Sequence, residues 1–152
     1  MELKPNIGIG NIKFGMTKNA IIQTLGMPDK IKIEEDDSDS QYLEYNSHNL
    51  RLTIYKNEED RLGYIYSSHK DLTYNGLLII DQDIDVVKRE VFRDLVKTWE
   101  IEDYDFFSVH GDDLNWLTLN EEFGKVKSVE IGVPWKNEEE YDWPDGGFFK
   151  SQ

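Results

Sequence analysis

Few residues of this 152-residue chain have the types and spacing that metal binding requires. His48, His69 and His110 are far apart in the sequence, and none has a partner at the short spacing typical of metal ligands. Asp81 and its alternating acids begin like a calcium loop, but the required glycine and final glutamate are replaced by other residues. We therefore expect no metal site and no cofactor.

Nucleophilic and redox chemistry are equally poorly represented. The chain has no cysteine, which excludes disulfides, thiolate nucleophiles and thiolate metal ligands. It has no Gly-x-Ser-x-Gly segment, and the spacing of Gly8, Gly10 and Gly15 does not match a dinucleotide-binding loop. The acidic run over 34–39 could hold a divalent ion weakly or form a solvated loop. Paired carboxylates of a hydrolase remain an alternative, but we predict that the protein is not an enzyme and has no catalytic residues.

The composition predicts a single globular domain over 1–152. Hydrophobic residues make up 38% and aromatic residues 12% of the chain, which is enough for one core, while 32% charged residues indicate a very polar surface. No segment has the apolar length of a signal peptide or a bilayer span. We therefore expect a cytoplasmic protein with no membrane partner.

The net charge of −14 is concentrated in the second half. Residues 1–70 hold nine basic and eleven acidic residues, whereas 71–152 hold eight and twenty. Between Thr98 and Gly124 there is no lysine or arginine. The acids of this segment are Glu100, Glu102, Asp103, Asp105, Asp112, Asp113, Glu121 and Glu122. Such a surface repels nucleic acid and attracts cationic partners, although it could also be only a solvated face.

The two halves of the chain share a pattern of apolar runs and turns. Residues 42–67 align with 106–131 at a constant offset of 64, which pairs a turn at Asn46–Asn49 with one at His110–Asp113 and a loop at 56–60 with one at 120–124. The same offset pairs Thr17 with Asp81 as candidate helix N-caps. The sequence therefore predicts two degenerate repeats, at about 7–69 and 72–135, and an acidic aromatic tail over 136–152.

Each repeat is expected to contain one helix. The first begins after Thr17, continues to about Leu25 and ends at Gly26 and Pro28. The second is expected from Asp81 or Asp83 to about Lys97, with apolar residues at three- and four-residue spacing. Both helices are interpreted as structural.

Alternating strands complete each repeat. Leu50, Leu52 and Ile54 alternate with polar residues, as in a sheet with one buried face. In the second repeat the alignment places Leu114 and Trp116 in the inner phase and Leu117 and Leu119 in the outer one, so that sheet could be apolar on both faces. We predict an α+β fold in which two strand-helix-strands repeats form one mainly antiparallel sheet with two helices packed on it.

The segment GIGNIKFGMTKNAIIQTLGMPDKI, followed by YLEY, LRLTIY and RLGYIY, resembles immunity proteins of bacterial polymorphic toxin and contact-dependent inhibition systems. Its Gly-Met-Thr and Leu-Gly-x-Pro arrangement is also similar to the repeat of secreted β-lactamase inhibitor proteins and of small outer-membrane assembly lipoproteins. The resemblance is clear over about 7–67. The second half lacks these motifs.

The resemblance implies a protein that binds the C-terminal domain of a cognate toxin and blocks its active site. A basic nuclease-type toxin would match the acidic, aromatic second half. The expected toxin-binding residues are Glu100, Glu102, Asp103, Tyr104, Asp105, Phe106, Asp112, Asp113, Asn115, Trp116, Glu121 and Glu122. Residues 138–145 of the tail could add to them. We expect a monomer or weak homodimer, and the alternative is an acidic inhibitor or adaptor of a cellular enzyme unrelated to toxins.

Overall fold

The computed structural model describes residues 1–33 and 39–144 and is mainly β. An eight-stranded antiparallel sheet runs in the order β10-β11-β12-β13-β7-β6-β5-β4. Its strands are β4 (Lys30–Ile33), β5 (Ser40–Tyr45), β6 (Leu50–Tyr55), β7 (Arg61–Ser67), β10 (Glu100–Asp103), β11 (Ser108–Asp112), β12 (Leu117–Glu122) and β13 (Lys125–Gly132). This sheet confirms the α+β class with few helices.

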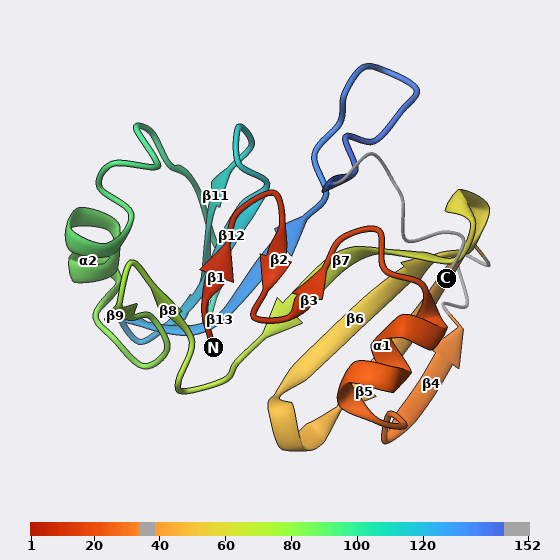
Figure 1. Ribbon diagram of the computed structural model, residues 1–152. Coiled ribbons are helices and arrows are strands. Elements are labelled where there is room, and N and C mark those ends of the chain that lie inside the picture. The colour runs from red at the N-terminus through yellow and green to blue at the C-terminus, as the bar shows by residue number, and fades with distance from the viewer. Residues whose placement is uncertain (34–38, 145–152) are drawn as a thin grey trace.

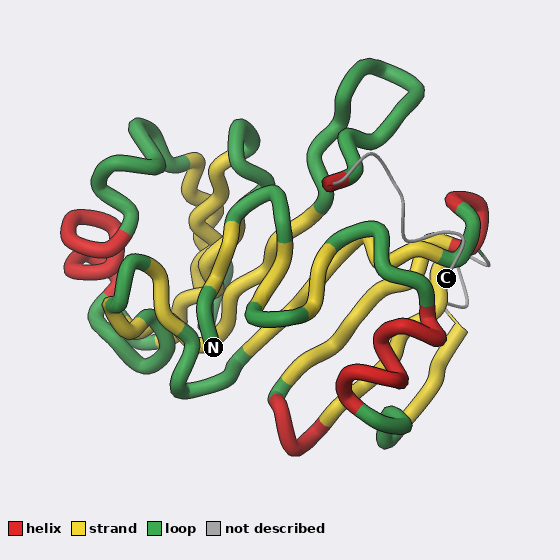
Figure 2. The backbone as a smooth tube through the Cα atoms, viewed as in Figure 1, coloured by secondary structure: helices red, strands yellow, loops and turns green. Residues whose placement is uncertain are grey.

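The remaining elements are short. A three-stranded sheet holds β1 (Leu3–Lys4), β2 (Gly8–Ile9) and β3 (Ile12–Lys13), and a hairpin holds β8 (Thr73–Tyr74) and β9 (Leu77–Leu78). The helices are α1 (Lys18–Leu25) and α2 (Ile84–Val86), and α2 continues as a π-helical turn over Val87–Val91. Figures 1 and 2 show α1 and the β1–β3 sheet in front of one face of the large sheet, with α2 at the β11–β12 end. None of the described helices is long and apolar enough to cross a membrane.

The core lies between the large sheet and these short elements. Alternate residues of the strands point to this covered face and are buried, for example Leu43, Leu52, Ile65 and Val129. They pack with Ile21 of α1 and with residues of the other short elements in one cluster. The opposite face of the sheet carries no helix (Figure 1), so the strands present their other side chains to solvent there.

Helix α1 confirms the expectation from sequence. The Thr17 hydroxyl accepts a hydrogen bond from the amide of Ala20 at 3.2 Å, which satisfies one free donor of the first turn. Gly26 follows Leu25 with a positive φ of 87° and donates its amide to the carbonyl of Ile22. A left-handed residue without a side chain ends the helix at little cost.

The second helix is much shorter than the sequence predicts. Asp83, not Asp81, is the N-cap, and its carboxylate accepts hydrogen bonds from the amides of Asp85 and Val86. The helical segment ends at Val91 rather than near Lys97. Here Phe92 turns inward and stacks on the ring of Tyr74 at 5.2 Å. Burial of this aromatic ring outweighs the helical periodicity of the following residues.

The register of β12 also differs from the sequence alignment. Residues 113–116 form the turn that was expected at His110–Asp113, because His110 and Asp112 belong to β11. Leu117 and Leu119 are therefore the inner residues and are fully buried, while Leu114 is 86% exposed. The inner and outer phases assigned from sequence are thus reversed, and the second half of the sheet is not apolar on both faces.

A shorter loop explains this error. Five residues, 56–60, connect β6 to β7, whereas only Phe123 and Gly124 connect β12 to β13. Both residues of the short turn have positive φ, 53° and 83°, as two-residue hairpin turns often require. Because three residues are missing here, equivalent positions are 67 apart before the loop and 64 apart after it. An ungapped alignment cannot follow that change.

The two halves share the same backbone contacts between helix start and sheet. The amide of Gly15 donates to the carbonyl of Leu62, and the amide of Leu62 donates to Met16. In the second half, Asp81 donates to Val126, and Val126 donates to Gln82. The caps also match, since Thr17 bridges Arg61 and Asp83 bridges Lys125, the first residues of β7 and β13.

Candidate protein-binding surface

The first part of the predicted surface is a tight turn between β10 and β11. The amide of Tyr104 donates to the carbonyl of Phe107 at 2.8 Å, and the two rings stack with centroids 4.7 Å apart. Phe106 projects from the same turn and is 77% exposed. A large apolar side chain held this far into water is unusual in a turn and is typical of a contact surface.

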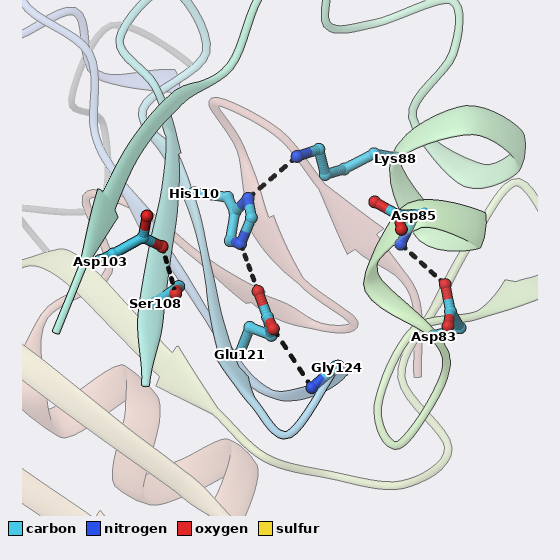
Figure 3. Close-up of polar contacts among 8 residues, drawn as sticks. All are labelled: Asp83, Asp85, Lys88, Asp103, Ser108, His110, Glu121 and Gly124. Atoms are coloured by element: carbon cyan, nitrogen blue, oxygen red, sulfur yellow. Dashed lines mark hydrogen bonds and ion pairs between the residues drawn. The ribbon is translucent and has the colours of Figure 1, made fainter. Parts of the chain in front are cut away.

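Acidic side chains flank these rings. The Tyr104 hydroxyl donates to the Glu102 carboxylate at 2.8 Å, and this hydrogen bond raises the pKa of Tyr104. The Ser108 hydroxyl donates to Asp103 at 2.6 Å (Figure 3). Asp105 is exposed at the tip. The carboxylates that the sequence predicted here are therefore held close to the aromatic rings.

The end of β12 lies at the same end of the sheet. Ser108 pairs with Glu121, so the next residues of β12 and its turn, Glu122 and Phe123, are beside the start of β11. Phe123 is 90% exposed. We call this group the aromatic turn surface. It consists of Glu102, Asp103, Tyr104, Asp105, Phe106, Phe107, Glu122 and Phe123.

The other predicted residues lie at the opposite end of β11. Glu100 pairs with Gly111, and the turn over 113–116 follows β11 at that end. A strand of five residues is roughly 16 Å long. The fold therefore separates Glu100, Asp113 and Trp116 from the aromatic turn surface, although all three are exposed.

Two of the residues at this far end have internal roles. Asp112 is buried, and its carboxylate accepts hydrogen bonds from the amide of Leu114 and from the side-chain amide of Asn115 at 2.7 Å. The Asn115 amide also donates to the carbonyl of Leu95 at 3.3 Å. These contacts hold the turn closed, so neither side chain is directed toward a partner.

Glu121 belongs to a partly buried polar chain. Figure 3 shows the Lys88 ammonium 3.0 Å from Nδ1 of His110, whose Nε2 lies 2.7 Å from the Glu121 carboxylate. The second carboxylate oxygen accepts the amide of Gly124 at 3.2 Å. Because an ammonium can only donate, we assign the His110 proton to Nε2.

This chain replaces apolar residues of the first half. At the offsets of 66 and 67, the positions of Lys88, His110 and Glu121 correspond to Ile22, Leu43 and Ile54. The polar chain connects the π-helical turn to β11 and β12, and His110 is buried in it. We therefore interpret Glu121 as a structural residue. The described residues include no group of three acidic or histidine side chains that could hold a metal ion.

The uncovered face of the large sheet is a second candidate surface, and it was missed from the sequence. The Arg51 guanidinium lies over the rings of Tyr42 and Tyr66, at 5.3 and 4.9 Å. The Tyr64 hydroxyl donates to Glu130 at 2.9 Å, and the Asn120 amide donates to the same carboxylate at 2.8 Å. Burial, followed by the Glu130 charge, raises the pKa of Tyr64 well above its usual range.

A sequence signal for this face was present. Tyr64 and Tyr66 alternate with buried residues in the segment RLGYIY, as do Arg51 and Thr53 in LRLTIY. That alternation placed these side chains opposite the core, but it gave no order of the strands. Only the sheet order brings the tyrosines of β5 and β7 to either side of Arg51.

The acidic runs expected to hold a divalent ion or extend the binding site are only partly described. Glu34, Glu35, Asp36 and Asp37 lie outside the described residues, as does Asp145 at the end of the tail. In the described part of the tail, Tyr141 stacks on Trp135 with centroids 4.0 Å apart, and Trp143 lies beneath the Arg61 guanidinium at 4.2 Å. These contacts attach the tail to the first half of the sheet, away from the aromatic turn surface.

No protein-family model and no curated protein sequence matches the chain. One solved structure is similar to it, described as the 1.5 Angstrom resolution crystal structure of an extracellular protein containing a SCP domain from Bacillus anthracis str. Ames. The TM-score is 0.45 with 11% identity, over 75% of this chain and 42% of that one. The chain thus spans less than half the length of that protein, and so weak a likeness assigns neither family nor function.

Proposed function

We propose that this protein is an immunity protein that binds the C-terminal domain of a cognate bacterial toxin and blocks its active site. The observation that carries the proposal is the aromatic turn surface, where exposed rings of Phe106 and Phe123 stand among carboxylates at one end of an open sheet. Aromatic side chains bury large areas at interfaces, and acids around them favour a basic partner.

The charge of the chain supports a basic partner. Eight acids and no lysine or arginine occupy the segment between Thr98 and Gly124. Their field acts over a Debye length of about 10 Å and accelerates encounter with a positive surface. A nuclease cleft that binds phosphates is such a surface. Acids would then set the association rate, while the buried rings would slow dissociation.

We further propose that the chain consists of two degenerate copies of one strand-helix-strands unit, at about 7–69 and 72–135, in a single domain. The matched hydrogen bonds of Gly15 with Leu62 and of Asp81 with Val126 support this duplication. The first copy keeps the motif of the resembled family. The second has lost the motif and gained the exposed acids and rings, which supports its role as the contact.

The proposed role is non-catalytic and requires neither cofactor nor nucleic acid. A protein that protects the cell producing a toxin would act in the cytoplasm, and the net charge of −14 opposes binding to phosphate backbones or anionic lipids. The acidic enzyme inhibitor unrelated to toxins is the alternative outcome of the experiment below.

Co-expression with a toxin fragment tests the proposal. An immunity gene should directly follow a large gene with a variable toxic C-terminus, and the fragment encoded there should be neutralised by this protein. The variants Asp105→Lys with Glu122→Lys, and Phe106→Ala with Phe123→Ala, should weaken protection and lower the salt dependence or the lifetime of the complex, respectively. Both pairs lie on the aromatic turn surface.

A matched control is available on the same chain. Asp71→Lys with Asp94→Lys makes the same change in net charge at exposed positions outside the surface, and it should leave protection intact. Equal loss in the control would reduce the effect to net charge alone. If the double variants at the aromatic turn protect as well as the unchanged protein, this surface is not the toxin contact.

A further inference from the structure

The two end strands of the large sheet, β4 and β10, have complementary sequences. Strand β4 reads Lys-Ile-Lys-Ile over Lys30–Ile33, and β10 reads Glu-Ile-Glu-Asp over Glu100–Asp103. Every residue of both strands is exposed. Among the described strands of this sheet, each of the two pairs on one side only. An exposed edge of this kind is a template for another strand.

The registers place like residue types on like faces. Lys30 pairs with Glu44 and Lys32 with Tyr42, so both lysines lie on the uncovered face. Glu102 pairs with Val109 and Glu100 with Gly111, which puts these two acids on the same uncovered face. On the covered side, Ile31 is 42% exposed and Ile101 51% exposed.

The strand directions allow the two edges to pair. All neighbours in the eight-stranded sheet are antiparallel, so its first and last strands run in opposite directions. A second molecule that simply continues the sheet therefore brings its β4 antiparallel to β10 of the first, with the faces matched. Residue pairs in this register are Lys30 with Glu102, Ile31 with Ile101 and Lys32 with Glu100.

We propose that this protein associates with itself head to tail, through β4 of one molecule and β10 of the next. Opposite charges face each other directly on one side of the joint and two isoleucines on the other, an arrangement that stabilises antiparallel pairs. Pairing of two β4 strands would oppose lysines, and pairing of two β10 strands would oppose acids. The edges therefore select the heterologous contact, which extends the sheet rather than closing a dimer.

Neighbouring charges and net charge limit the strength of this contact. Lys32 already lies 3.6 Å from Glu44 on β5, and Arg51 of β6 faces the same side. The charge of −14 on each molecule adds general repulsion. We therefore expect association at protein concentrations of roughly 0.1–1 mM. The proposal does not depend on toxin binding, since it concerns the protein alone.

Single cysteines test the contact, because the chain has none of its own. In an oxidising mixture of the Ile31→Cys and Ile101→Cys proteins, we expect a disulfide-linked dimer that contains one of each. Either protein alone should form at least tenfold less dimer. An Ile33→Cys protein mixed with Ile101→Cys is the register control, since its Cα lies beyond the distance that a disulfide spans. Equal cross-linking in all mixtures, or none, would overturn the proposal.

Charge reversal provides an independent readout by sedimentation equilibrium. Lys30→Glu with Lys32→Glu makes both edges acidic, and Glu100→Lys with Glu102→Lys makes both basic, so each double variant should stay monomeric at 1 mM. Mixing the two variants, or combining all four changes in one chain, should restore association. Far-ultraviolet circular dichroism checks that each variant is folded. Association that persists in either double variant, or fails to return in the mixture, contradicts the edge contact.

Discussion

The Tyr64 hydroxyl of β7 donates a 2.9 Å hydrogen bond to the Glu130 carboxylate of β13 across the line where the two halves of the sheet meet. Asn120 of β12 donates to the other oxygen of the same carboxylate and also to the Ser128 hydroxyl. Three strands are therefore linked by one carboxylate on the uncovered face. A charged acceptor in a partly buried network contributes more to stability than an exposed pair does.

Removing the Tyr64 hydroxyl should flatten the loss of stability at alkaline pH. Folding raises the pKa of Tyr64 above the ordinary value of about 10, so its stabilising effect is complete below that pH and is lost as the pH rises above it. Urea unfolding at pH 8 and pH 10.5 should show a smaller fall in the free energy of unfolding for Tyr64→Phe than for the unchanged protein.

Two other tyrosines account for the fall that remains in Tyr64→Phe. Burial also raises the pKa of Tyr45 and Tyr141, so alkaline destabilisation should be reduced but not abolished. An identical fall between the two pH values in the variant and the unchanged protein would contradict the assignment to Tyr64.

The chain of Lys88, His110 and Glu121 should behave as a unit. Glu121→Leu alone leaves the His110 Nε2 proton without its acceptor in a buried position, and we expect a loss of about 1–3 kcal/mol in the free energy of unfolding. Restoring the apolar trio of the first half, with Lys88→Ile, His110→Leu and Glu121→Ile together, should recover most of that loss. Chemical unfolding of both variants distinguishes this from simple additivity, which predicts that the triple variant is the least stable.

Two leucines three residues apart test the register of β12. Leu117→Ala removes a fully buried side chain and should cost about 2–5 kcal/mol. Leu114→Ala, in the exposed turn, should change stability by no more than about 0.5 kcal/mol. Thermal or urea unfolding measures both. The reverse order would support the phase that the ungapped alignment assigned.

The two helix caps should have similar strengths. Thr17→Ala and Asp83→Ala each remove a side-chain acceptor from the first turn, with an expected loss of about 1 kcal/mol in the free energy of unfolding. Asp81→Asn is the control, because it keeps a residue that tolerates the positive φ of 65° and loses only an exposed contact with Lys127. A larger loss for Asp81→Asn than for Asp83→Ala would identify Asp81 as the cap.

Local signals in the sequence predicted the first helix and its ends. Thr17, Gly26 and the short apolar face act through contacts within a few residues, so no tertiary information was needed. The strand pattern around Leu50, Leu52 and Ile54 was likewise sufficient to predict which side chains are buried. The exposed acids and rings of 102–106 were also recognised from their composition, and the fold confirms that they lie together.

The tertiary structure decided what depends on pairing between distant strands. A period of two tells which residues share a face, but the phase of β12 depended on a loop shortened by three residues, and a shift of an odd number exchanges the faces. The same pairing placed Asp113 and Trp116 far from Tyr104 and gave Asp112 and Glu121 internal partners. Sheet order, which no local pattern contains, also brought Arg51 between two tyrosines and left β4 and β10 as opposite, oppositely charged edges. Sequence alone therefore determined the elements and the composition of the surface, while strand pairing determined which of its residues act together.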